Sequence, residues 1–143
     1  MEGGGSSVKD KSNEAREQWL KSFMAIYKQA SPLIDTVAKL DTEGQPASLD
    51  SLLEAYRSFG PLLQALKEMP KPPQKELRNI KNDFEKTLSM CIKAGEMAMK
   101  MVDDLRHGAN LASRMHFSTI VGYIGYAEIY YKVLLDRLTK IGV

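Results

Sequence analysis

Apolar residues recur at alternating steps of three and four through four separate segments of this 143-residue chain. This spacing places one apolar side chain per turn on the same face of an α-helix, and such a face must be buried against another element. No segment shows the period-two alternation that is typical of a strand. The sequence therefore predicts an all-α fold, and the clearest of the four rows is Trp19, Phe23, Ile26, Ala30, Leu33, Val37 and Leu40.

The first half of the chain is expected to hold two helices. The first should run from about Asn13 to Leu40, and the second should follow a loop over residues 41–47 that is rich in turn-forming residues. Ser48 is a good N-cap for this second helix, because its hydroxyl can accept a hydrogen bond from a free N–H of the first turn. A proline-rich stretch over residues 69–74 then ends the second helix.

The second half is expected to hold two longer helices. Pro72 or Pro73 suits the first turn of the third helix, which should run to about His107 and end at Gly108 as the C′ residue. The core row expected for this third helix is Leu77, Ile80, Phe84, Thr87 or Leu88, Cys91, Ala94 or Gly95, Ala98, Val102 and Leu105. The fourth helix should cover residues 111–141. Because short connections make neighbouring helices antiparallel, we predict an up-down-up-down four-helix bundle.

Two prolines fall inside predicted helices. The apolar row continues in register past Pro32, which predicts a kink there and not an end, and Gly60-Pro61 should break or bend the second helix. Either these are two independently tolerated bends, or they lie at similar heights and open a small gap in the bundle. Such a gap would bind an apolar or aromatic ligand, and its expected lining is Trp19, Tyr27, Tyr56 and Phe59.

The length and composition predict one domain preceded by a tail. Residues 1–13 are mostly glycine and polar residues without apolar periodicity, and we expect them to be disordered. Residues 14–143 are expected to form a single four-helix-bundle domain, since 43% hydrophobic and 27% charged residues are ordinary values for such a domain.

Charge and cysteine usage narrow the classes of partner. With 20 Lys and Arg against 18 Asp and Glu, the net charge of +2 provides no strong field for nucleic acid or an anionic membrane. The longest uncharged run, residues 117–127, is far shorter than the roughly 20 residues of a membrane-spanning helix. A single cysteine, Cys91, fits a reducing compartment, and with no apolar leader at Met1 we expect a cytoplasmic protein.

Catalytic and metal-binding patterns are missing from the sequence. The two histidines do not follow a glutamate at the Glu-x-x-His spacing of di-iron bundles, and no nucleophile elbow or glycine-rich phosphate loop occurs. Cys91 lies on the apolar row of the third helix, where a thiol is inert. We therefore predict no enzyme, no cofactor and no metal site, and we expect Met90, Met97 and Met101 to serve in packing and not as haem ligands.

Basic residues form a column on the third helix. Lys86, Lys93, Lys100 and His107 recur every seven residues, with acidic residues between them. The column is either a strip for phosphate or acidic partners, or a solvated face stabilised by ion pairs along the helix. The interleaved acidic residues favour the solvated face.

The fourth helix is the one segment with two apolar arcs. Its expected core row is Phe117, Ile120, Ile124, Ala127, Tyr131, Leu134 and Leu138. Gly122 on the other side costs roughly 1 kcal/mol of helix stability relative to alanine, and close approach of another helix is a usual reason for such a glycine. The second arc is Met115, Thr119, Gly122, Tyr126, Ile129 and Val133, with Tyr123 and Tyr130 between the two arcs.

Three helices provide enough apolar surface to cover only one of these arcs. We therefore predict a non-enzymatic interaction or structural protein that forms a homodimer, or binds a protein partner, through the second arc. In the alternative arrangement the fourth helix is the central helix of an irregular bundle, and its own chain covers both arcs. The alternative function is a bundle that binds a small apolar ligand.

Overall fold

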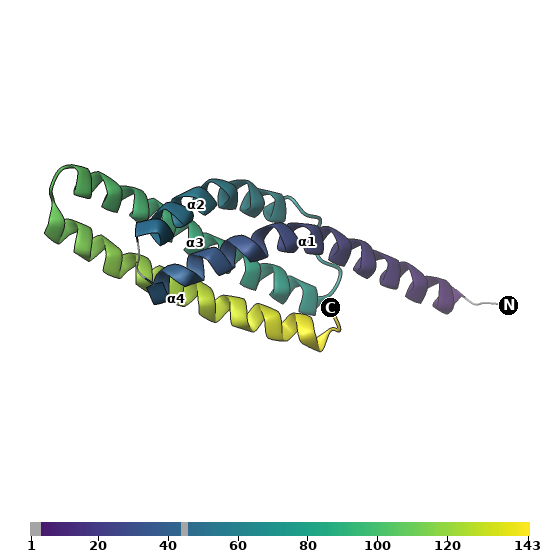
Figure 1. Ribbon diagram of the computed structural model, residues 1–143. Helices are drawn as coiled ribbons and strands as arrows, with labels where there is room; N and C mark the ends of the chain where they lie inside the picture. The colour runs from purple at the N-terminus through teal and green to yellow at the C-terminus, as the bar shows by residue number, and fades with distance from the viewer. Residues whose placement is uncertain (1–3, 44–45) are drawn as a thin grey trace.

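The computed structural model describes the backbone of residues 4–43 and 46–143, and the side chains of residues 13–38 and 50–143. Four helices account for nearly all of these residues, and the described part of the chain contains no strand. They pack as an antiparallel four-helix bundle (Figure 1), so the predicted fold class is confirmed. The helices are α1 (Gly4–Glu43), α2 (Pro46–Lys67), α3 (Lys75–Arg106) and α4 (Asn110–Lys140).

The start of α1 differs from the prediction. The helix begins at Gly4, so the described part of the expected disordered tail over residues 1–13 is helical. Residues 1–3 lie outside the described residues. No proline interrupts residues 4–13, and each residue added to an existing helix gains a backbone hydrogen bond at little cost. Figure 1 shows these first turns projecting beyond the other three helices.

The start of α2 also differs from the prediction. The helix begins at Pro46, so Ser48 lies inside its first turn and is not the N-cap. Proline suits the first helical position because its fixed φ is already helical and its missing N–H would have no partner there. Of the predicted loop over residues 41–47, only residues 44–45 remain between the helices, and they lie outside the described residues.

Both internal prolines are accommodated within continuous helices. Pro32 lies inside α1 and Pro61 inside α2, so Gly60-Pro61 does not end the second helix. The Thr36 hydroxyl donates a hydrogen bond of 2.9 Å to the Pro32 carbonyl oxygen one turn earlier. The kinks at the two prolines stay a prediction.

Glycines close the last two helices. Gly108 has a φ of 72° and follows α3, as predicted for a C′ residue. The Ala109 N–H donates to the backbone carbonyl oxygen of Asp104 at 2.8 Å, and the Gly108 N–H donates to that of Leu105 at 3.2 Å. These two bonds are a Schellman motif, which satisfies carbonyl groups that the helix end leaves free. Gly142, with a φ of 80°, makes the same pair of bonds after α4.

The core lies where the apolar rows of all four helices meet. The row predicted for α3 is buried from Leu77 to Ala98, and Phe23, Phe59 and Phe84 are fully buried at its centre. The Trp19 indole N–H donates to the Pro70 carbonyl oxygen at 3.1 Å, which ties α1 to the segment before α3. The buried residues of α4 are Ser113, Ile120, Ile124, Ala127, Leu134 and Leu138.

Hydroxyl groups join α1 to α4. The Ser31 and Tyr131 hydroxyls lie 2.8 Å apart, and the Tyr27 hydroxyl lies 3.4 Å from that of Tyr131. Burial raises the pKa of Tyr131 to about 12. Tyr131, predicted on the core row, therefore packs its ring inward while its hydroxyl is satisfied by α1.

The hairpin of α3 and α4 forms the most extensive helix pair and projects past α1 and α2 at its turn (Figure 1). An ion pair of 2.7 Å between Asp83 and Arg137 ties the two helices near one end. Leu105 near this turn is 48% exposed, so its predicted place in the core is wrong.

Candidate interaction surface

An exposed apolar stripe runs along the outer face of α4. We call it the α4 stripe; its members are Leu111, Met115, Gly122, Tyr126, Ile129 and Val133. The five large side chains are between 39% exposed, at Val133, and 74% exposed, at Leu111. A Cβ atom built on Gly122 would meet nothing within 4 Å. The second arc therefore lies on the surface of the single chain, and the alternative in which α4 is covered on both sides is wrong.

The stripe is exposed because of how α4 sits in the bundle. Its opposite face is buried against α3 through residues such as Ile120, Ile124 and Leu134, while α1 touches it only along one edge. A helix packed on one face presents its other face to solvent, and that face is normally charged or polar. Here the outer face carries apolar side chains, which is the property that marks it as a candidate site.

Leu111 extends the stripe beyond the predicted residues. It lies in the first turn of α4, four residues before Met115 and therefore on the same face. That spacing was the signal in the sequence for including it. With Leu111, the stripe spans 22 residue steps of helix up to Val133, or about 33 Å at 1.5 Å per residue.

Tyr123 and Tyr130, predicted between the two arcs, lie at the edge that faces α3. Both are partly buried. The Lys93 ammonium lies 5.9 Å from the centre of the Tyr123 ring, and that of Lys86 lies 5.4 Å from the centre of the Tyr130 ring. The two tyrosines therefore border the α4 stripe, and two members of the predicted basic column are engaged with the protein's own aromatic rings.

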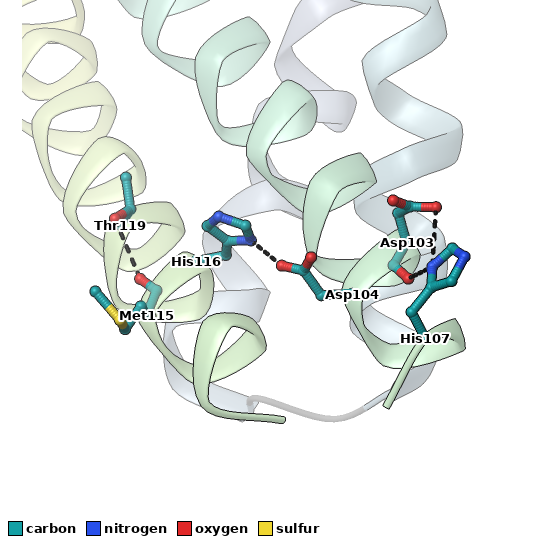
Figure 2. Close-up of polar contacts among 6 residues, drawn as sticks. All are labelled: Asp103, Asp104, His107, Met115, His116 and Thr119. Carbon is teal, nitrogen blue, oxygen red and sulfur yellow. Dashed lines mark hydrogen bonds and ion pairs between the residues drawn. The ribbon is translucent and has the colours of Figure 1, made fainter. Parts of the chain in front are cut away.

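Thr119 also belongs to the exposed face, but it adds little polarity. Its hydroxyl donates to the Met115 carbonyl oxygen at 3.2 Å, one turn earlier (Figure 2). The hydroxyl proton of Thr119 is therefore satisfied within α4.

Charged residues flank the α4 stripe without entering it. Arg114 and Lys132 are exposed and lie 18 residues apart, which is five turns of helix. They consequently occupy the same flank, on the side away from Tyr123 and Tyr130. The stripe itself carries no charge from Leu111 to Val133.

The four aromatic residues predicted to line a ligand-binding gap do not surround a common cavity. Trp19 and Phe59 are core residues, 4% and 0% exposed, and Tyr27 is packed against Phe23 and Tyr131. Trp19 and Tyr56 line two different surface cavities. The structure therefore does not bring these four aromatic residues around one site.

The reactive side chains lie apart from one another. Among the described residues, no three His, Cys, Asp or Glu side chains come together as a metal site would require. Burial raises the pKa of the Cys91 thiol to about 12, so the thiolate, which is the reactive form, is suppressed. Met90, Met97 and Met101 of α3 are partly buried against the core, as expected for packing residues.

Each histidine pairs with an aspartate at the projecting end of the α3–α4 hairpin (Figure 2). His116 Nδ1 lies 2.6 Å from Asp104 Oδ2, and this contact is the only polar partner of either atom among the described residues. His107 Nδ1 lies 2.8 Å from the Asp103 carbonyl oxygen, within one helical turn. The first pair joins α4 to α3 and the second stays within α3, so both have structural partners.

None of the described helices is long and apolar enough to cross a lipid bilayer. No protein-family model, no curated protein and no solved structure matches this chain.

Proposed function

We propose that this protein is a non-enzymatic interaction protein that self-associates through the α4 stripe. The observation that carries the proposal is the exposure of five large apolar side chains along one face of a single helix. Apolar surface removed from water gains roughly 25 cal/mol per Å², so a partner that covers this face is favoured. Scattered apolar residues need no explanation, but a contiguous row of them marks an interaction site.

The shape of the stripe favours another helix as the partner. It is straight, about one side chain wide and about 33 Å long. Arg114 and Lys132 flank it on one side, and Tyr123 and Tyr130 on the other. Two such faces pack by interdigitating their side chains, and a small residue such as Gly122 lets the backbones approach. Tyrosine suits the surface because its ring offers apolar area while its hydroxyl can stay wet.

The occupant that we propose is α4 of a second copy. Most described residues of the apolar rows of α1, α2 and α3 are buried or half-buried in the chain's own bundle, and among the described residues only α4 has an exposed apolar face of this length. A second copy presents a surface of the same length and the same lack of charge. Symmetric dimers in which both subunits use the same patch are also the commonest soluble oligomers. The lone cysteine is a buried free thiol, which supports a reducing, cytoplasmic location.

The test replaces one stripe residue by a charge. Tyr126→Glu places a carboxylate in the contact and should dissociate the dimer. The dissociation constant should rise about a hundredfold or more, because an unpaired charge buried at an interface costs several kcal/mol. Multi-angle light scattering reports the mass, and far-ultraviolet circular dichroism reports the helicity, which should not change.

The matched control is Met99→Glu, because Met99 is an exposed apolar residue, 53% accessible, on α3 and outside the stripe. It should leave the dimer intact. Equal dissociation by both variants, or no dissociation by Tyr126→Glu, contradicts the proposed surface.

A further inference from the structure

A cavity of about 330 Å³ opens on the surface between α2 and α3, and we call it the α2–α3 groove. Its volume lies at the lower end of the range of small-molecule sites, which is about 300–1,000 Å³. Two helices contribute three residues each to its lining. These residues are Leu53, Tyr56, Arg57, Met99, Val102 and Arg106.

Four of the six lining residues are apolar or aromatic. Leu53, Tyr56 and Val102 are half-buried, and Met99 is 53% exposed. Tyr56 packs directly against Gly95, where there is no room for a Cβ atom, so this wall of the groove has a fixed position. Apolar surface that water still touches favours the binding of an apolar group.

The two arginines lean toward each other over the groove. Because α2 and α3 are antiparallel and Tyr56 faces Gly95, Arg57 lies near the Gly95 end of the groove. Arg106 comes 11 residues after Gly95, about 16 Å farther along α3, and lies at the other end. Long side chains of a helix point back toward its N-terminus. In an antiparallel pair this tilt directs Arg57 and Arg106 toward each other, above the apolar residues between them.

Neither guanidinium has a carboxylate partner among the described residues, since no ion pair of this part of the chain includes Arg57 or Arg106. The acidic residue three positions before each arginine is directed elsewhere. Glu54 lines a separate cavity between α1 and α2, and the Asp103 carboxylate lies 3.6 Å from His107 Nδ1. Both arginines are exposed, so the groove carries two positive charges that a bound anion can neutralise.

We propose that the α2–α3 groove binds a small amphipathic anion, namely a carboxylate on an apolar chain such as a medium-chain fatty acid. The carboxylate lies between Arg57 and Arg106, whose planar guanidinium groups offer pairs of N–H donors that match its two oxygens. The apolar chain covers Leu53, Met99 and Val102. The site is formed by α2 and α3 alone and does not depend on self-association through α4.

The lining excludes ligands that carry only half of this chemistry. A neutral apolar molecule leaves both guanidinium groups without a partner. A small anion without an apolar part leaves the hydrophobic lining in contact with water. The volume of the groove fits a single small molecule and not a folded partner, whose interface would extend far beyond six residues.

Binding of octanoate to the full chain tests the site, with octanol as the probe of the same chain length without the charge, and acetate as the charge without the chain. Isothermal titration calorimetry at neutral pH, below the concentrations at which octanoate forms micelles, measures the affinity. Saturable binding of octanoate is expected, with octanol at least about tenfold weaker because it cannot form charge-assisted hydrogen bonds. In a methyl NMR spectrum, the Met99 signal should shift with octanoate and not with acetate.

Substitution of each arginine tests its role. Arg57→Gln and Arg106→Gln should each weaken octanoate binding about tenfold and leave octanol binding unchanged, since each removes one charged partner of the carboxylate. The matched control is Arg78→Gln, because Arg78 is an exposed arginine on α3 outside the groove. It should bind octanoate as the native chain does. Circular dichroism checks that all three variants keep the native helicity.

Three results would overturn the proposal. The first is the absence of saturable octanoate binding, and the second is equal affinity for octanoate and octanol. The third is octanoate binding that Tyr126→Glu weakens while Arg57→Gln and Arg106→Gln leave it intact, because the ligand would then occupy the α4 stripe and not the groove. None of these results depends on whether the native chain is a monomer or a dimer, which light scattering measures separately.

Discussion

At the scale of single residues, one close approach between helices is made at a glycine. A Cβ atom on Gly95 of α3 would lie 2.4 Å from Cδ1, 2.5 Å from Cγ and 2.7 Å from Cβ of Tyr56 on α2. These atoms include the root of the tyrosine side chain, so a small rotation of the ring does not relieve the overlap. The packing of α2 on α3 therefore depends on the absence of a side chain at position 95.

Gly95→Ala should destabilise the protein by about 1–2 kcal/mol, because overpacking costs about 1–3 kcal/mol and the better helix propensity of alanine returns up to about 1 kcal/mol. Urea denaturation at a dilution where the protein is monomeric measures the change. Gly122→Ala is the matched control: its Cβ meets open space, so it should stabilise the monomer by up to about 1 kcal/mol. An equal increase in the free energy of unfolding for both variants would show that Tyr56 does not pack tightly against Gly95.

The buried thiol of Cys91 makes stability depend on alkaline pH. Burial raises its pKa from 9.0 to about 12, so the folded state holds the proton more tightly than the unfolded state. The stability that this proton contributes is complete below pH 9 and is lost as the pH rises from 9 toward 12. At about 1.4 kcal/mol per pKa unit, the loss is at most about 4 kcal/mol.

Two measurements check this expectation. Between pH 9 and 11, the free energy of unfolding should fall more steeply for the native chain than for Cys91→Ala. At pH 8, a thiol reagent should modify Cys91 only as fast as the protein unfolds. Rapid labelling in the absence of denaturant would show that the thiol is not sealed in the core.

At the scale of helices, the turn between α3 and α4 depends on a left-handed residue. Gly108→Ala forces a Cβ into a conformation with a φ of 72°, which costs roughly 1–2 kcal/mol for an L-residue. Thermal unfolding should show the loss. Gly108→Asn should recover part of it, because asparagine tolerates this conformation better than alanine. A Gly108→Ala protein as stable as the native chain would mean that the Schellman turn is not needed to close the hairpin.

Helix faces were predictable from the sequence, and helix ends were less so. The spacing that placed Leu77, Phe84 and Ala98 on one row depends only on helical geometry, and all three are buried. The start of α1 at Gly4 and that of α2 at Pro46 were missed because helix extension into polar residues depends on small free energies. Periodicity also does not report how far a neighbouring helix reaches, so the exposure of Leu105 at the projecting hairpin was not foreseen.

The same limits apply to the α4 stripe. A helical wheel separated its residues from the core row, and their exposure shows that the separation was sound. The position of Tyr123 and Tyr130 at the edge of the stripe could not be predicted from the sequence, because their cation–π contacts are made with lysines of another helix. The close approach of Tyr56 to Gly95 was likewise invisible in the sequence, since it joins two helices whose relative height no local pattern determines.

At the scale of the whole molecule, the bundle leaves a long apolar face exposed on α4. Most described residues of the α1, α2 and α3 rows are buried or half-buried within the chain, while the α4 stripe is exposed. A second copy covers that surface without any change in the fold. Because the stripe lies along the long axis of the bundle, two copies would lie side by side and not end to end.

The measurement that tests this account most directly is the mass of the native chain over a range of concentrations by sedimentation equilibrium. We predict a reversible, concentration-dependent approach to twice the 16.0 kDa of one chain, and a mass of 16.0 kDa for Tyr126→Glu throughout the same range. A native protein that stays at 16.0 kDa from micromolar to near-millimolar concentrations would contradict the central claim.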